Sequence, residues 1–261
     1  MDFEVTTYHT LMAFWFLFVL LQTFCMVVIK QKSLQRIHDY PMGPQKLYIP
    51  KSIAWKLISV PAIPSILYFF WTAKETTALA LNDPGLVFVC LYCLHYSYRT
   101  FVFPYRIRVK EQRYSIILIF ITWTYYIPMG YFLGHHFAST EIVETHLQSP
   151  IFWLGLFIFM LGLAGNIVHD EILVRLRTGP SKTYKIPNKG LFRYTSNAHY
   201  FSEIVEWAGF LILSLSLPAL LHFLAVFILM IPQAMKTHRW YKNYFGERYP
   251  SNRKALIPFV F

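Results

Sequence analysis

Seven long apolar runs constrain the fold of this chain more than any other feature of its sequence. A helix needs about 20 apolar residues to cross a bilayer, and 56% of the 261 residues are hydrophobic whereas only 14% are charged. We therefore expect an all-α membrane protein, folded as the single domain 1–261, with seven transmembrane helices. The first run has acids and no Lys or Arg before it, which predicts a retained helix and not a signal peptide. The predicted spans are, approximately, 8–29, 52–71, 86–103, 115–133, 151–168, 201–216 and 217–232.

The basic residues predict the orientation of these helices. Of the 24 Lys and Arg residues, all except Lys74 fall in four segments, which are 30–56, 99–113, 169–198 and 233–261. Basic loops stay in the cytosol, so the N-terminus is expected outside and the C-terminus in the cytosol. The net charge of +11 is spread over these short loops, which favours lipid headgroups or an anionic ligand as partner and no nucleic acid.

Two carboxylates, Glu203 and Glu206, lie within the sixth predicted span. An ionisable side chain in a spanning helix costs about 2.5–3.5 kcal/mol on insertion scales, so it marks a functional site or a paired structural charge. His199, Glu203 and Glu206 share one helical face by their spacing of four and three residues. The alternative is that both acids simply pair with a Lys or Arg of another helix.

Asn166, Asp170 and Arg177 form a second polar stripe, at helical spacing, from the fifth span into the following loop. An amide, an acid and a guanidinium match the amide, ribose hydroxyls and phosphates of a nucleotide. An ordinary ion pair at a helix end is the alternative. The loop 170–200 is basic, which suits a phosphate-bearing ligand or anionic lipid headgroups equally well.

The end of the third span and the C-terminal segment are also rich in aromatic and basic residues. Tyr98 and Arg99 are typical of aromatic-belt and snorkelling residues at a membrane border, whereas the phenol of Tyr96 lies deeper and can deliver a proton to a reacting carbon. The segment 238–254 either closes over a cofactor or lies flat on headgroups. The chain has no Rossmann, P-loop or zincin motif, and its three cysteines lie in apolar runs without metal-like company, so we expect no metal site.

Four stretches together resemble the steroid 5α-reductase family of NADPH-dependent membrane reductases: LHYSYRTFVF at 94–103, GNIVHDEILVRLR at 165–177, YKIPNKGLFRYTSNAHYFSEIVEW at 184–207 and HRWYKNYFGERYPSNRKALIPF at 238–259. The resemblance implies a seven-helix fold in which NADPH enters from the cytosol and a lipid substrate from the bilayer. It implies that 110–261 is the cofactor-binding portion and that Tyr96 protonates the α carbon of the substrate after hydride reaches the β carbon. The residues implied to bind the cofactor are Asn166, Asp170, Arg177, Tyr184, Glu203, His238 and Tyr241.

Three departures from the pattern of the steroid reductases concern the substrate. Ser59 stands where they have an acid, and Ile121 stands at about the place of an Arg that helps to hold the substrate ketone. His199 replaces their Asn, although the polyprenol reductase branch of the family has His there. Ser59 is then a weak donor to a carbonyl, and His199 is expected, with Glu203, to orient the nicotinamide carboxamide.

The leading hypothesis is an NADPH-dependent reductase of a carbon–carbon double bond in a steroid enone or another unsaturated lipid. One alternative is a membrane enzyme like the isoprenylcysteine methyltransferases, which use S-adenosylmethionine; others are a seven-helix transporter and an inactive family member. We expect a monomer, located in the endoplasmic reticulum if the source is eukaryotic and in the inner membrane if it is bacterial.

Overall fold

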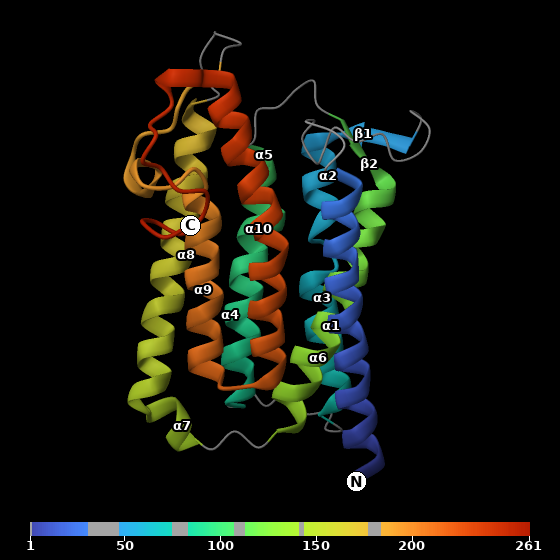
Figure 1. The fold of residues 1–261 in the computed structure, drawn as a ribbon. Coiled ribbons are helices and arrows are strands. Elements are labelled where there is room, and N and C mark those ends of the chain that lie inside the picture. Colours follow the sequence, from blue (N-terminus) through green and yellow to red (C-terminus); the bar gives the residue numbers. More distant parts are fainter. Residues whose placement is uncertain (1, 31–46, 75–82, 107–112, 141–143, 177–183) are drawn as a thin grey trace.

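The computed structural model describes residues 2–30, 47–74, 83–106, 113–140, 144–176 and 184–261, which form a bundle of long helices (Figure 1). Two three-residue strands pair antiparallel at one end, where Tyr48 faces Ser115. In chain order the elements are α1 (Asp2–Lys30), β1 (Tyr48–Pro50), α2 (Lys51–Ile58), α3 (Ala62–Ala73), α4 (Gly85–Ser97), the π-helical turn η3 (Tyr98–Val102), α5 (Phe103–Arg106), β2 (Arg113–Ser115), α6 (Ile116–Ser139), α7 (Glu144–Gln148), α8 (Pro150–Leu176), the 3-10 turn η4 (Gly190–Arg193), α9 (Ala198–Ser214), α10 (Leu217–Phe245) and the 3-10 turn η5 (Gly246–Arg248).

Length and composition make this an all-α membrane protein. Six helical segments in the described residues, and not the expected seven, are long and apolar enough to cross a bilayer. The remaining predicted span is α9, which has 17 residues and two carboxylates. At 1.5 Å per residue it is about 25 Å long, somewhat less than a hydrocarbon core of about 30 Å. The six segments are Val5–Cys25, Ile53–Ala73, Gly85–Arg106, Ile116–Ser139, Pro150–Leu176 and Leu217–Arg248.

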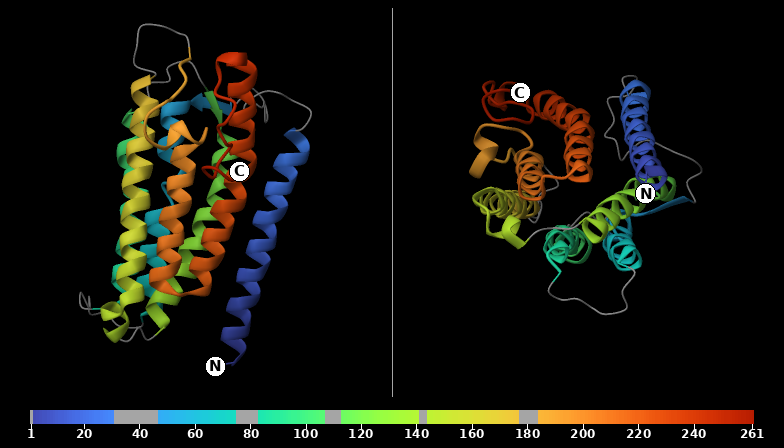
Figure 2. Two further views of the ribbon diagram at one scale, coloured as in Figure 1. Left: turned by 60° about the vertical axis from the view of Figure 1, so that its left-hand side comes forward. Right: turned by 90° about the horizontal axis from the view of Figure 1, so that it is seen from below.

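The helix ends next to the four basic segments of the sequence gather at one end of the bundle, the upper end in Figure 1. The N-terminal end of α1 and the short helix α7 lie at the opposite end. Seen along the bundle, α1 lies at the edge beside α6 and α10 (Figure 2). The Tyr8 hydroxyl on α1 donates a hydrogen bond to the Phe132 carbonyl of α6 at 2.7 Å, which fastens this peripheral helix.

Two predicted spans differ in detail from their helices. The second is broken into α2 and α3 around Ser59, because Pro61 has no N–H to continue the helical ladder. The seventh was expected to end at Pro232, but α10 continues through this proline to Phe245. His238 and Tyr241 therefore lie on the continued helix α10 and not on a tail. The chain then turns back, and the Lys254 amide donates to the Tyr194 carbonyl at 2.9 Å.

Glycines let α8 and α9 pack with their backbones in direct contact. A Cβ on Gly162 would lie 2.2 Å from the Glu206 backbone nitrogen, and one on Gly155 would lie 2.4 Å from that of Leu213. Small residues of this kind are the usual means of close helix packing in a membrane. The contact fixes the position of α9, and with it the two carboxylates that α9 carries.

We expect Gly162→Ala to lower the free energy of unfolding by about 1–3 kcal/mol, because the added methyl group meets backbone atoms that cannot turn away. The matched control is Gly165→Ala on the same helix, whose Cβ would meet a side-chain atom, Ser202 Oγ, at 2.9 Å. Both changes gain the same helix propensity, so the difference between them isolates the clash. Thermal unfolding of the two purified variants measures it, and equal stabilities would contradict the prediction.

Candidate functional site

An ion-pair cluster lies where α4, α8 and α9 meet. Arg99, in the π-helical turn at the end of α4, donates from Nη1 to Asp170 Oδ2 at 2.8 Å and from Nη2 to Glu203. Asn166 Nδ2 also donates to Glu203 Oε2, at 3.2 Å. The side chains of Arg99 and Glu203 are each 13% exposed and that of Asp170 is 3% exposed, so water screens these charges little. The cluster therefore pairs these two carboxylates with one largely buried guanidinium.

His95 connects this cluster to Glu206, the second carboxylate of α9. His95 Nδ1 lies 2.8 Å from Glu206 Oε1, and His95 Nε2 lies 3.9 Å from Glu203 Oε1. Glu206 is fully buried, and its other oxygen has no hydrogen-bond partner among the described residues. Glu203 is thus paired with an arginine of another helix, as the alternative interpretation of the sequence expects, whereas the neighbour of Glu206 is a histidine and not a Lys or Arg.

Tyr96 is the next residue along α4 and is buried among aromatic rings. Its ring lies 4.6 Å from Tyr92, 5.3 Å from Tyr126 and 5.9 Å from Trp207, measured between ring centroids. These rings come from α4, α6 and α9. The phenol thus adjoins both the charged cluster and the apolar interior of the bundle.

Ser59 occupies a buried position at the break between α2 and α3, where its hydroxyl forms a hydrogen bond with the Thr100 hydroxyl at 2.9 Å. Thr100 follows Arg99 in the π-helical turn. In this structure Ser59 therefore supports the turn that carries Arg99, a contact that the sequence did not suggest.

Asn166 and Asp170 lie on the same buried face of α8, four residues apart. Asn166 Nδ2 donates to the His199 backbone carbonyl at 2.9 Å, which holds the first turn of α9. Asn166 Oδ1 is buried and has no hydrogen-bond partner in the described part of the chain. The ring of His199 lies beside Tyr200 at 4.1 Å. An amide oxygen in this position can accept a hydrogen bond from a ligand.

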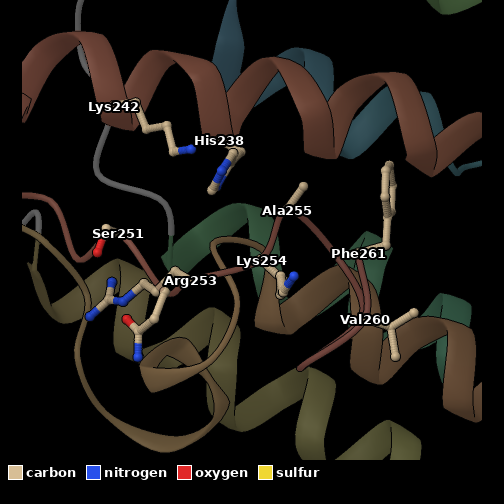
Figure 3. A pocket seen from close by; sticks show the side chains of 9 residues that line it. His238, Lys242, Ser251, Arg253, Lys254, Ala255, Val260 and Phe261 are labelled. Atoms are coloured by element: carbon tan, nitrogen blue, oxygen red, sulfur yellow. The ribbon is translucent and has the colours of Figure 1, made fainter.

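His238 lines a cavity of about 360 Å³ between the last turns of α10 and the returning C-terminal segment (Figure 3). His238 Nδ1 lies 2.5 Å from Ser196 Oγ, which also contacts the Tyr249 hydroxyl at 2.6 Å. Ser196 is only three residues before His199, so the cavity adjoins the start of α9. The cavity is lined by His238, Lys242, Ser251, Asn252, Arg253, Lys254, Ala255, Val260 and Phe261.

The other residues implied to bind a cofactor lie near the same end of α10. Tyr184 packs against Trp240, with 4.8 Å between ring centroids, and Tyr241 stacks on Tyr249 at 5.4 Å. Arg177 lies outside the described residues. The candidate residues thus form two groups, one inside the bundle and one at its basic end, and the first turns of α9 connect them.

Two site residues were not predicted from the sequence: Arg99 was interpreted as a membrane-border residue, and His95 had no assigned role. The border position of Arg99 suggested a side chain that reaches out to headgroups, but the guanidinium points inward. The signal that identifies it is the pair of acids on α9: two carboxylates in an apolar helix require a cation from a neighbouring helix. His169 was also missed. It links Ser202 Oγ, 3.0 Å from Nδ1, to the Leu191 amide, 3.1 Å from Nε2.

Comparison with known proteins identifies the family. The family model described as 3-oxo-5-alpha-steroid 4-dehydrogenase matches residues 112–261. The chain is 36% identical over 228 residues to 3-oxo-5-alpha-steroid 4-dehydrogenase 2 of Macaca fascicularis and 35% identical over 227 residues to that of Homo sapiens, and each match covers 86% of both chains. It is 35% identical over 216 residues to 3-oxo-5-alpha-steroid 4-dehydrogenase 1 of Rattus norvegicus, with 81% of both chains covered. This chain therefore belongs to the 3-oxo-5-alpha-steroid 4-dehydrogenase family.

Proposed function

We propose that this protein is an NADPH-dependent reductase of a carbon–carbon double bond in a lipid, either a steroid enone or another unsaturated lipid. Family membership supports an oxidoreductase acting on CH–CH groups. The observation that carries the proposal is the cluster of Asn166, Asp170 and Glu203, which lies next to Tyr96 inside an apolar bundle. In this proposal the polar groups bind the cofactor, and Tyr96 beside them is the proton donor to the substrate.

The residues present fit NADPH. Asn166 Oδ1 is a buried acceptor that still lacks a partner among the described residues, and an amide N–H of the nicotinamide carboxamide suits it. Glu203 offers a second acceptor, and His199 begins the same helix. The basic cavity around His238 suits a phosphate, and Asp170, Arg177, Tyr184 and Tyr241 complete the proposed cofactor site within 110–261. When bound, NADPH supplies the hydride that the β carbon receives.

Tyr96 delivers the proton to the α carbon in this proposal. Its phenol is a general acid held in a fixed position by the rings of Tyr92, Tyr126 and Trp207. The apolar rings exclude water from the reacting carbon. Ser59 is a weak donor to a substrate carbonyl when the Thr100 hydroxyl donates in their shared hydrogen bond, because the hydrogen of the Ser59 hydroxyl is then free.

The gathering of the helix ends at one end of the bundle supports a cytosolic basic end, an external N-terminus and seven crossings that include α9. The lipid substrate then enters from the bilayer, and the cofactor enters from the cytosol. We also propose that the protein acts as a monomer, in the endoplasmic reticulum of a eukaryote or the inner membrane of a bacterium. The match to this family removes the support for a methyltransferase or a transporter.

Detergent-purified protein should gain thermal stability with NADPH, and less with NADH or S-adenosylmethionine. A ligand that binds only the folded state at 100 times its Kd stabilises it by about 2.7 kcal/mol. A differential thermal unfolding assay with the three ligands measures the shift. A shift with S-adenosylmethionine alone would contradict the reductase. A shift with NADPH but no turnover of unsaturated lipids would indicate a family member without activity.

A further inference from the structure

A second polar cluster lies inside the bundle, and the proposed reaction uses none of its polar atoms. His222, in the second turn of α10, is completely buried and lies 4.2 Å from the Trp207 ring, measured between centroids. The Tyr125 hydroxyl of α6 lies 2.9 Å from His222 Nδ1. The three residues come from three different helices, so the tertiary fold builds this contact.

This cluster has polar atoms that the described residues leave unsatisfied. His222 Nε2 and Trp207 Nε1 are both buried, and neither has a hydrogen-bond partner within the described part of the chain. A buried polar group without a partner costs about 1–3 kcal/mol. An ionisable ring within a membrane bundle is rare and marks a functional site by default. Two such atoms on adjacent rings therefore indicate a place for a ligand.

The tautomer decides which ligand suits the cluster. When the Tyr125 hydroxyl donates to Nδ1, the hydrogen of the imidazole is on Nε2. The indole nitrogen of Trp207 can only donate. Both unsatisfied atoms are then donors, and the group that they recognise is an acceptor oxygen, as in a carbonyl or a hydroxyl.

The cluster adjoins Tyr96 through ring contacts, and its Trp207 ring also lies 4.8 Å from His95 of the charged cluster, measured between centroids. The rings of Trp207 and Tyr92 separate His222 from Tyr96, with 5.9 Å from Trp207 to Tyr96 and 5.8 Å from Tyr92 to His222. His222 lies near the start of α10, and His238 lies near its other end. A lipid that places its double bond at Tyr96 can extend past these rings towards His222.

We propose that His222, oriented by Tyr125, and Trp207 form a second polar contact for the lipid substrate and bind a carbonyl or hydroxyl oxygen distant from the double bond that is reduced. The inference rests on the proposed reductase function and adds a substrate class to it: lipids with an oxygen at the end opposite the reacting carbons. It also gives this chain a polar contact with substrate that is separate from positions 59 and 121, where the residues expected to hold a ketone are absent.

The test compares two probes that share one enone and differ only at the distant end: androst-4-ene-3,17-dione, which has a second carbonyl, and androst-4-en-3-one, which lacks it. Binding of each probe to the full chain with NADP⁺ is measured at equilibrium for wild type, His222→Phe and Tyr125→Phe. Phe retains the ring contacts and removes the polar atoms. Tyr8→Phe is the control, because it also removes a phenol hydroxyl, partly buried in this case, and its hydrogen bond, at a distant site on α1.

We expect wild type and Tyr8→Phe to bind the dione more tightly than the mono-ketone, by about tenfold for one hydrogen bond to a buried group. His222→Phe should lose this preference and Tyr125→Phe should lose part of it, while the mono-ketone and NADPH bind as they do to wild type. Equal weakening of both probes in His222→Phe would mean a structural role and would overturn the inference. Equal binding of both probes by wild-type protein that still binds NADPH would also overturn the inference. In that case the reductase proposal would stand. Absence of NADPH binding would instead remove the reductase proposal and the inference with it.

Discussion

Tyr96→Phe should lose turnover of the unsaturated lipid by about 100- to 10,000-fold, the usual contribution of a positioned general acid, and should still bind NADPH. The substitution removes one oxygen atom from a ring that is buried between α4, α6 and α9. Phe retains the ring contacts with Tyr92, Tyr126 and Trp207, so the bundle should keep its packing. The loss should therefore appear in kcat, with little change in the thermal shift caused by NADPH.

Tyr126→Phe is the control for this prediction. Tyr126 lies on α6 with its ring 5.3 Å from that of Tyr96, and this change also removes a phenol hydroxyl from the interior. Single-turnover assays of both variants with NADPH and one enone separate the two hydroxyls. Full activity in Tyr96→Phe would mean that another group delivers the proton, and an equal loss in both variants would mean that the pair acts through packing.

Hydropathy predicted much of the fold, because burial in lipid requires long apolar helices wherever the chain crosses. It did not predict that α10 continues through Pro232, since neighbouring helices can compensate a missing N–H and the sequence of one helix does not show its neighbours. The same limit applies to Ser59, whose partner Thr100 is 41 residues away. Local patterns describe single helices, whereas these features depend on contacts between them.

The sequence predicted those site residues whose polar or charged side chains stand out within a single apolar helix, because burying such side chains is costly. Glu203 and Glu206 stand out because an apolar helix carries them, and Asn166 and Asp170 share a stripe at helical spacing. The direction of Arg99 was not predictable in this way. A residue at the end of a span can point outward to headgroups or inward to acids, and here the π-helical turn Tyr98–Val102 changes the helical phase at this residue. The hydrogen bond between Tyr125 and His222 joins residues 97 positions apart, and although a histidine in an apolar run is conspicuous, the sequence does not show which residue it contacts.

Arg99→Met should be the most destabilising single substitution in the cluster. Arg99 bonds to both Asp170 and Glu203, and Met keeps an unbranched side chain but removes the charge. Removal of one partner from a buried ion pair costs about 3–5 kcal/mol, because the remaining charge loses its compensation without regaining water. We expect this loss in the thermal unfolding of detergent-purified protein, together with weaker binding of NADPH, because Glu203 loses its support.

Arg106→Met is the matched control, since Arg106 also pairs with an acid of α8, Glu171, but its side chain is 50% exposed. An exposed pair of this kind contributes about 0–1 kcal/mol, so the control should unfold close to wild type. Arg99→Met combined with Glu203→Gln should recover part of the stability, because the second change removes one uncompensated carboxylate, while NADPH binding stays weak. Equal stabilities of the two single variants would show that Arg99 is solvated at the membrane border, as its position in the sequence suggested, and that the carboxylates of α9 are compensated by other groups.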